Sequence, residues 1–171
     1  MGMLMSANRE QLIKQMTDFV INVLEEKLPE FSGFAVCPFV KADRIKDQLH
    51  IDVLETPKDT LVDVVLRFVR SGKRSALIGQ PNINVKASET KGYREFINLV
   101  LEEAGYGEIG ALCFNPNSDM NIEGYSPYTS MPFFMINFAY FNDLEKARRS
   151  LLKTDYYNKM PKTYKNFLGL K

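Results

Sequence analysis

Residues 49–79 read LHIDVLETPKDTLVDVVLRFVRSGKRSALIG and decide the fold. Apolar and polar side chains alternate over the first five residues, which predicts a half-buried strand. The apolar side chains that follow recur at helical spacing, at Leu61, Val65, Phe68 and Val69. Thr56-Pro57 is a start signal for this helix and Ser71-Gly72 is a stop signal. A short apolar run at 75–79 predicts a second strand, so we expect a parallel strand pair joined by a crossover helix.

Further periodic segments lie on both sides of this unit. Before it, a helix with Ser6 or Asn8 as its cap is expected to run to Pro29, followed by a buried but irregular stretch over Phe31–Val40. After it, helices are expected over residues 88–104 and 142–152, the latter with Asn142 and Glu145 as a capping-box-like start. Strands are expected at Ile109–Phe114 and Phe133–Tyr140.

This order of elements predicts an α+β fold with a four-stranded mixed sheet. We expect the helices to pack mainly on one face of the sheet and the last strand to pair antiparallel. An N-terminal helix, a C-terminal helix and a basic-aromatic tail complete the expected architecture. The side chains expected to be buried against the sheet are Leu12, Phe19, Val23, Leu61, Val65, Phe68, Phe96, Ile97, Val100 and Leu101.

Length and composition indicate one globular domain. The chain has 171 residues, of which 45% are hydrophobic and 25% charged, with a net charge of +1. Residues 1–152 are expected to form the domain and 153–171 a tail docked on it. Such a balanced charge gives no general attraction to nucleic acid or to an anionic membrane.

The chain is expected to be a soluble cytoplasmic protein. It has no apolar run long enough to span a bilayer and no signal peptide pattern. Cys37 and Cys113 are therefore not expected to form a disulfide. With His50 as the only histidine, they do not make a structural zinc site, and we expect neither a metal nor a cofactor.

Cys37-Pro38-Phe39, called the CPF turn below, is the first candidate site. A cysteine in a proline-bearing turn can act as a nucleophile when it is a thiolate, and His50 or a carboxylate would then have to serve as its base. The alternative is that Cys37 is a small buried apolar residue, and that His50 is a solvent-facing strand residue. We favour this alternative, with Phe39 as a ligand-binding side chain.

The loop at 115–131 is the second candidate site, because long loops in compact domains are often functional. Its candidate ligand-binding residues are Asn115, Tyr125, Ser126 and Tyr128. Residues 117–123 alternate in a way that resembles a calcium loop, but Ile122 stands where such a loop needs glycine. The asparagines and aspartate of this loop are therefore expected to shape turns.

The tail holds five lysines, one acid and interleaved aromatics. Lysines and aromatics together can bind single-stranded nucleic acid by charge and stacking. The same residues can instead dock the tail on the domain with the lysines in solvent, as the neutral overall charge favours. If the tail docks, four aromatic side chains are expected to be buried: Tyr156, Tyr157, Tyr164 and Phe167.

Two short motifs resemble an uncharacterised bacterial domain family, a domain of unknown function marked by a CPF turn and a late Ser-Pro-Tyr segment. They are Cys37-Pro38-Phe39 and Ser126-Pro127-Tyr128, and Phe114-Asn115-Pro116 is similar to that family's Phe-His-Pro step. The similarity covers about Gly33–Leu152. The chain departs from the family pattern at Asn115, where histidine is usual, and at Gly124-Tyr125, where Asn-Arg is usual. The resemblance implies a fold and a site location, and it implies no activity.

Three functions are therefore weighed. The leading hypothesis is a small binding domain whose ligand or protein-partner surface lies around the CPF turn and the 115–128 loop, because no complete catalytic set is present. The first alternative is a thiol-dependent enzyme with Cys37 as its nucleophile. The second is nucleic-acid binding through the tail, which the overall charge makes the weakest of the three. The sequence leaves the oligomeric state open.

Overall fold

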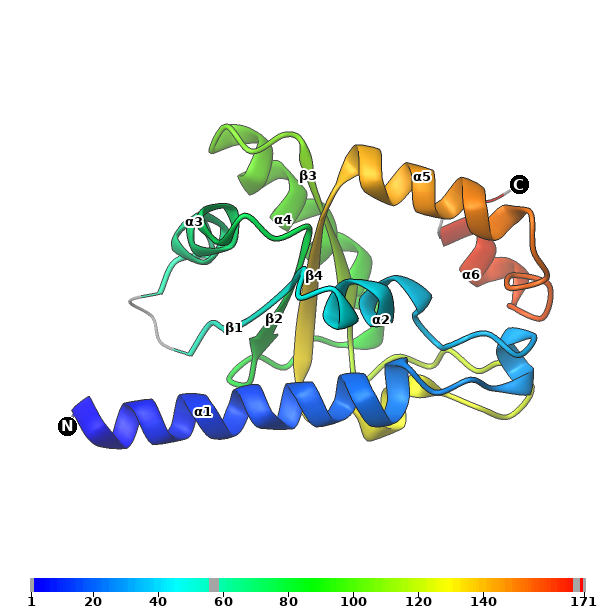
Figure 1. The fold of residues 1–171 in the computed structure, drawn as a ribbon, viewed down its shortest axis with the longest axis horizontal. Coiled ribbons are helices and arrows are strands. Elements are labelled where there is room, and N and C mark those ends of the chain that lie inside the picture. The colour runs from blue at the N-terminus through cyan, green and yellow to red at the C-terminus, as the bar shows by residue number, and fades with distance from the viewer. Residues whose placement is uncertain (1, 56–58, 168–169, 171) are drawn as a thin grey trace.

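The protein has an α+β fold with a four-stranded mixed sheet, as the sequence predicts (Figure 1). The computed structural model describes residues 2–55, 59–167 and 170. The strands are β1 (Leu49–Val53), β2 (Ser75–Gln80), β3 (Ile109–Phe114) and β4 (Phe134–Tyr140). The α-helices are α1 (Gly2–Phe19), α2 (Pro38–Ile45), α3 (Leu61–Ser71), α4 (Thr90–Glu103), α5 (Phe141–Leu152) and α6 (Lys162–Phe167).

The strand order in the sheet is β1-β2-β4-β3. β1 and β2 pair in parallel, which confirms the expected crossover through α3. β4 pairs antiparallel with both β2 and β3, which confirms the expected direction of the last strand. Because β4 lies between two strands and is covered on both faces, its sequence is almost continuously apolar.

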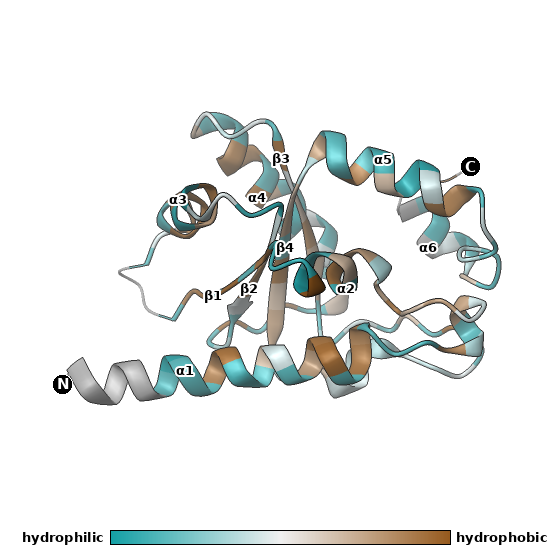
Figure 2. Ribbon diagram, in the orientation of Figure 1, coloured by the Kyte–Doolittle hydropathy of each residue, from teal (hydrophilic) through white to brown (hydrophobic). Residues whose placement is uncertain are grey.

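Helices cover both faces of this sheet, whereas the sequence predicts helices mainly on one face. The molecule therefore has one more layer of helices than expected. α3 and α4 pack on the face that carries Ala76 and Ile78 of β2. α1, α2 and α5 supply side chains to the opposite face, which carries Leu77 of β2. In Figure 1, α3 lies to the left of β4 and α2 and α5 lie to its right, while α1 runs along the bottom of the molecule. In Figure 2, β1 and β4 are largely hydrophobic, whereas α5 is largely hydrophilic.

The expected core residues divide into three groups. Five are buried: Phe19, Val65, Phe68, Ile97 and Leu101. Four others are partly buried, namely Leu12, Val23, Leu61 and Val100. The prediction for Phe96 is wrong, because its side chain is 57% exposed. α4 buries the stripe through Ile97 and Leu101, which are four residues apart, and this stripe leaves Phe96 outside the contact with the sheet.

Several predicted helix starts are also wrong. α1 begins at Gly2, before the expected caps Ser6 and Asn8, and its regular part ends at Phe19, after which Val20–Leu24 is π-helical. Pro29 begins a separate 3₁₀ turn. Asn142 lies inside α5, whose N-cap is Tyr140.

The start of α3 is a capping box that the sequence reading missed. Thr60 is the N-cap, and its side chain accepts a hydrogen bond from the backbone N–H of Asp63. The expected start signal, Thr56-Pro57, lies outside the described residues. The expected stop is confirmed, because Gly72 adopts the left-handed conformation with φ 68°.

Asp52 of β1 ties three elements together on the α3 face. It is 1% exposed and pairs with Arg9 of α1, while Arg67 Nε of α3 donates to Asp52 Oδ2 at 2.7 Å. Burial alone would raise the pKa of Asp52. The side chains of His50 and Arg67, the backbone N–H of Val53 and the charge of Arg9 together hold that pKa well below its usual range.

We expect Asp52→Asn to lower the free energy of unfolding by about 2 kcal/mol at neutral pH, because it removes the anion of a buried charge cluster. The loss is limited because Arg9 and Arg67 keep partial contact with solvent. Because the folded-state pKa of Asp52 is depressed, the ionised carboxylate stabilises the protein above about pH 4, near the pKa of the unfolded chain. This stabilisation is lost progressively as the pH falls from that value toward the folded-state pKa. Urea unfolding at several pH values checks both effects. The control is Asp47→Asn, since Asp47 is 92% exposed and should change stability by less than about 0.5 kcal/mol. Equal losses in the two variants would contradict the prediction.

Candidate functional site

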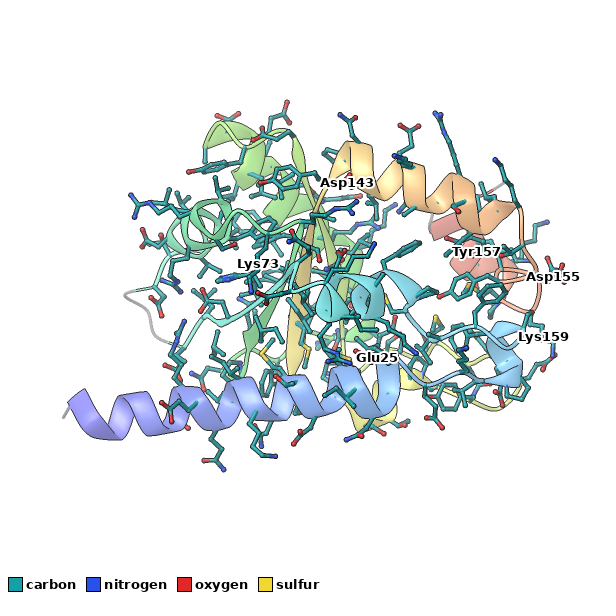
Figure 3. All side chains as sticks on the ribbon, viewed as in Figure 1. Glu25, Lys73, Asp143, Asp155, Tyr157 and Lys159 are labelled. Atoms are coloured by element: carbon teal, nitrogen blue, oxygen red, sulfur yellow. The ribbon has the colours of Figure 1, made fainter. Side chains whose placement is uncertain are left out.

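An internal cavity of about 140 Å³ lies on the sheet face that carries Leu77. The CPF turn and α2 form one wall, and the end of β3 with the 115–131 loop forms another. α5 and the tail close the third side. Figure 3 shows Asp143 in the first turn of α5 and Tyr157 in the tail beyond its last turn. Segments from four parts of the sequence therefore meet around one space.

Three of the predicted site residues line this cavity, namely Cys37, Phe39 and Tyr128. Cys37 is the N-cap of α2, and Pro38 occupies the first position of that helix, so the CPF turn is a helix start. Tyr128 lies in the 3₁₀ turn Pro127–Ser130 and packs near Phe114 with ring centroids 6.5 Å apart. The two motifs that carry the family resemblance thus both contribute residues to the cavity wall.

The other predicted loop residues shape the loop outside the cavity wall. Asn115 is buried, and its Nδ2 donates to the Val85 carbonyl at 2.7 Å, while its Oδ1 accepts from the Asn117 backbone N–H at 2.9 Å. The Ser126 side chain caps the 3₁₀ turn by accepting from the Tyr128 backbone N–H. Tyr125 packs edge-on against Phe31. These residues hold the loop in position.

The structure does not bring His50 and Cys37 together. His50 stacks on Phe68 with ring centroids 6.3 Å apart, on the α3 face, and its Nε2 lies 3.4 Å from Asp52 Oδ2. Cys37 packs on the opposite face of the sheet. The expectation that His50 faces solvent is only partly met, because its side chain is 21% exposed. This arrangement contains no thiol–imidazole pair.

The environment of Cys37 also favours the neutral thiol. Burial raises the pKa of Cys37 to about 11, the N–H groups of Val40 and Phe39 oppose the rise, and the charge of Asp43 adds to it. Burial likewise raises the pKa of Cys113 to about 12. Neither cysteine is disulfide-bonded.

We expect iodoacetamide to label both cysteines slowly at neutral pH, because only the thiolate reacts and both thiols are held neutral. The rate for the folded protein should be roughly 100-fold below that of free cysteine, and mass spectrometry of quenched samples measures it. The same protein in guanidinium is the control and should label at the rate of free cysteine. Fast labelling of Cys37 alone in the folded state would favour the thiol-dependent enzyme.

One end of the cavity is polar, and the sequence reading missed it. Asp43 of α2 accepts a hydrogen bond from Ser75 Oγ at 2.6 Å, and Arg74 pairs with Asp143 at 3.2 Å. The Arg74 and Asp143 side chains are 50% and 41% exposed, so this end opens to solvent. Arg148 of α5 lies in the same wall. Among the described residues, no group of His, Cys, Asp and Glu is placed to hold a metal ion.

The described part of the tail packs into the cavity wall. Tyr156 and Tyr157 are buried, and the Tyr156 hydroxyl donates to the Val36 carbonyl at 2.5 Å. The side chains of Tyr164 and Phe167 lie outside the described residues. Lys159 pairs with Glu123 at 3.5 Å. Two of the aromatic rings that nucleic-acid stacking would need are therefore inside the protein.

Comparisons with known proteins add no relative. No family model matches the chain, and neither the curated proteins nor the solved structures contain a match. The resemblance to the CPF and Ser-Pro-Tyr family stays a prediction. Among the described residues, no helix is both long and apolar enough to cross a bilayer.

Proposed function

We propose that this chain is a small-molecule-binding domain and that its ligand occupies the cavity between the CPF turn and the 115–131 loop. The observation that carries the proposal is the convergence of Cys37, Phe39 and Tyr128 on one largely apolar space with polar groups at a single end. A concave, mainly apolar site with a few convergent polar groups is the usual form of a ligand pocket.

The size of the cavity limits the ligand. Its volume of about 140 Å³ is close to that of an engineered cavity of about 150 Å³ that holds benzene. The apolar part of the ligand is therefore no larger than a small aromatic ring system or a short branched chain. A polar substituent would lie toward Asp43 and Arg74, at the end that opens to solvent.

The alternatives have less support. A thiol-dependent enzyme needs a base near Cys37, and His50 packs on the other face of the sheet. The nearby carboxylate, Asp43, already accepts a hydrogen bond from Ser75 Oγ, and the pKa of Cys37 is raised to about 11, mainly by burial. Nucleic-acid binding through the tail needs free aromatic rings, whereas Tyr156 and Tyr157 are buried. The two free thiols fit a reducing compartment, and we propose that the protein acts in the cytoplasm.

Indole fluorescence provides a direct test, because the chain contains no tryptophan. We expect indole to bind with a Kd below about 1 mM and its emission to shift to shorter wavelength on leaving water. Ala139→Leu extends a side chain into the cavity wall and should abolish this shift while the protein stays folded. The matched control is Ala42→Leu on the exposed side of α2, which should bind indole normally. Absence of binding, or equal binding by both variants, would contradict the proposal.

A further inference from the structure

We infer that the ligand of this cavity carries one carboxylate, which pairs with Arg148. The inference rests on the proposed function. Arg148 lies in the cavity wall and is partly buried, and among the described residues it has no ion-pair or hydrogen-bond partner. Its neighbour Arg149 pairs with Glu145 at 2.8 Å on the outer side of α5. Arg74, the other arginine of the wall, is already paired with Asp143.

A second donor faces the same space. Tyr157 is buried and packs edge-on against Tyr156 with ring centroids 4.9 Å apart. Its hydroxyl has no hydrogen-bond partner among the described residues. Burial raises the pKa of Tyr157, and the charge of Arg148 opposes that rise, which indicates that the guanidinium lies near the phenol. Arg148 and Tyr157 therefore offer one cation and one neutral O–H donor to a single acceptor group.

The carboxylates of the wall do not meet this need. Asp143 is paired with Arg74, and Asp43 accepts the hydroxyl of Ser75. Arg148 is only partly buried and stands in a largely apolar wall, where a planar carboxylate can accept two parallel hydrogen bonds from its guanidinium. A neutral ligand would leave Arg148 unpaired, and a cationic ligand would be repelled by it. The best match is a small ring or branched chain that ends in a carboxylate.

The test uses three probes of nearly equal shape, which compete with indole at neutral pH. They are phenylacetate, its neutral analogue phenylacetamide, and the cation phenethylamine. We expect the Kd of phenylacetate to be at least tenfold below that of phenylacetamide. Arg148→Met should remove this difference, which is measured as the ratio of the two Kd values within each variant. Arg149→Met, one position along the same helix, should keep the difference. Tyr157→Phe should raise the Kd of phenylacetate about threefold.

The outcomes separate the two proposals. If indole binds but phenylacetate has no advantage, or keeps its advantage in Arg148→Met, the carboxylate inference is overturned and the binding function stands. Tighter binding of phenethylamine than of phenylacetate would overturn it in the same way and would point to Asp43. If neither indole nor any of the three probes binds, the proposed function and the inference fall together.

Discussion

Phe68→Ala is expected to lower the free energy of unfolding by about 3–5 kcal/mol, because it removes a large ring from the centre of the α3 face and leaves a cavity. The Phe68 side chain is 0% exposed. Its ring lies 6.2 Å from that of Phe138 and 5.7 Å from that of Tyr140, measured between centroids. Chemical denaturation at neutral pH measures the loss from the shift in midpoint at constant slope.

Phe96→Ala is the matched control for this prediction. The same substitution at a ring that is 57% exposed should cost less than about 1 kcal/mol, since little apolar area returns to water. The sequence alone predicts that both side chains are buried and that Phe96→Ala also causes a large loss. A loss at Phe96 as large as that at Phe68 would mean that the face of α4 is misassigned.

The strands could be predicted because each one is short, apolar and bounded by turn residues. β4 is the clearest case: an almost continuously apolar run with three aromatic side chains and a single amide, Asn137, predicts a buried strand. Its place between β2 and β3 could not be predicted, because strand order depends on contacts between distant segments. The presence of helices on both faces depends on such long-range contacts as well.

Helix boundaries were predicted less well, for local reasons. α2 was missed because Phe34–Phe39 is apolar without a period, although Pro38 is a favourable first helical residue. The sequence analysis predicts the start of α3 from Thr56-Pro57, whereas the capping box in the structure is formed by Thr60 and Asp63. Two adjacent capping signals compete, and only tertiary contacts decide between them.

The candidate site was half predictable. Cys37, Phe39 and Tyr128 were found because unusual apolar and aromatic residues stand out in turns and loops. Arg148 cannot be recognised from the sequence, because a helix with many charged residues is interpreted as a solvent-exposed surface. The spacing of the charged residues does not distinguish Arg148 from the adjacent Arg149. The only available signal was the helical period, which turns Leu144 and Arg148 toward the same side as Leu151.

Deletion of Thr154–Lys171 is expected to have the largest effect of all. Among the described residues of this segment, it removes three buried side chains, Tyr156, Tyr157 and Met160, which are 6%, 8% and 5% exposed. At roughly 1.5–3 kcal/mol for each, the free energy of unfolding should fall by about 5 kcal/mol after the tail regains its conformational freedom. The loss opens one wall of the cavity, so indole binding should also disappear. Denaturation curves and indole titration of the truncated chain measure the two effects.

A shorter deletion, of residues 161–171, separates packing from charge. It keeps the three buried side chains and removes three of the five tail lysines. A docked tail predicts that this chain retains more than half of the lost stability and binds indole normally. A tail that binds nucleic acid predicts instead that the full chain binds a single-stranded oligonucleotide with a steep dependence on salt, and that the shorter deletion weakens this binding without affecting stability. Because Lys153, Lys159 and Lys162 are exposed while Tyr156 and Tyr157 are buried, we expect the first result.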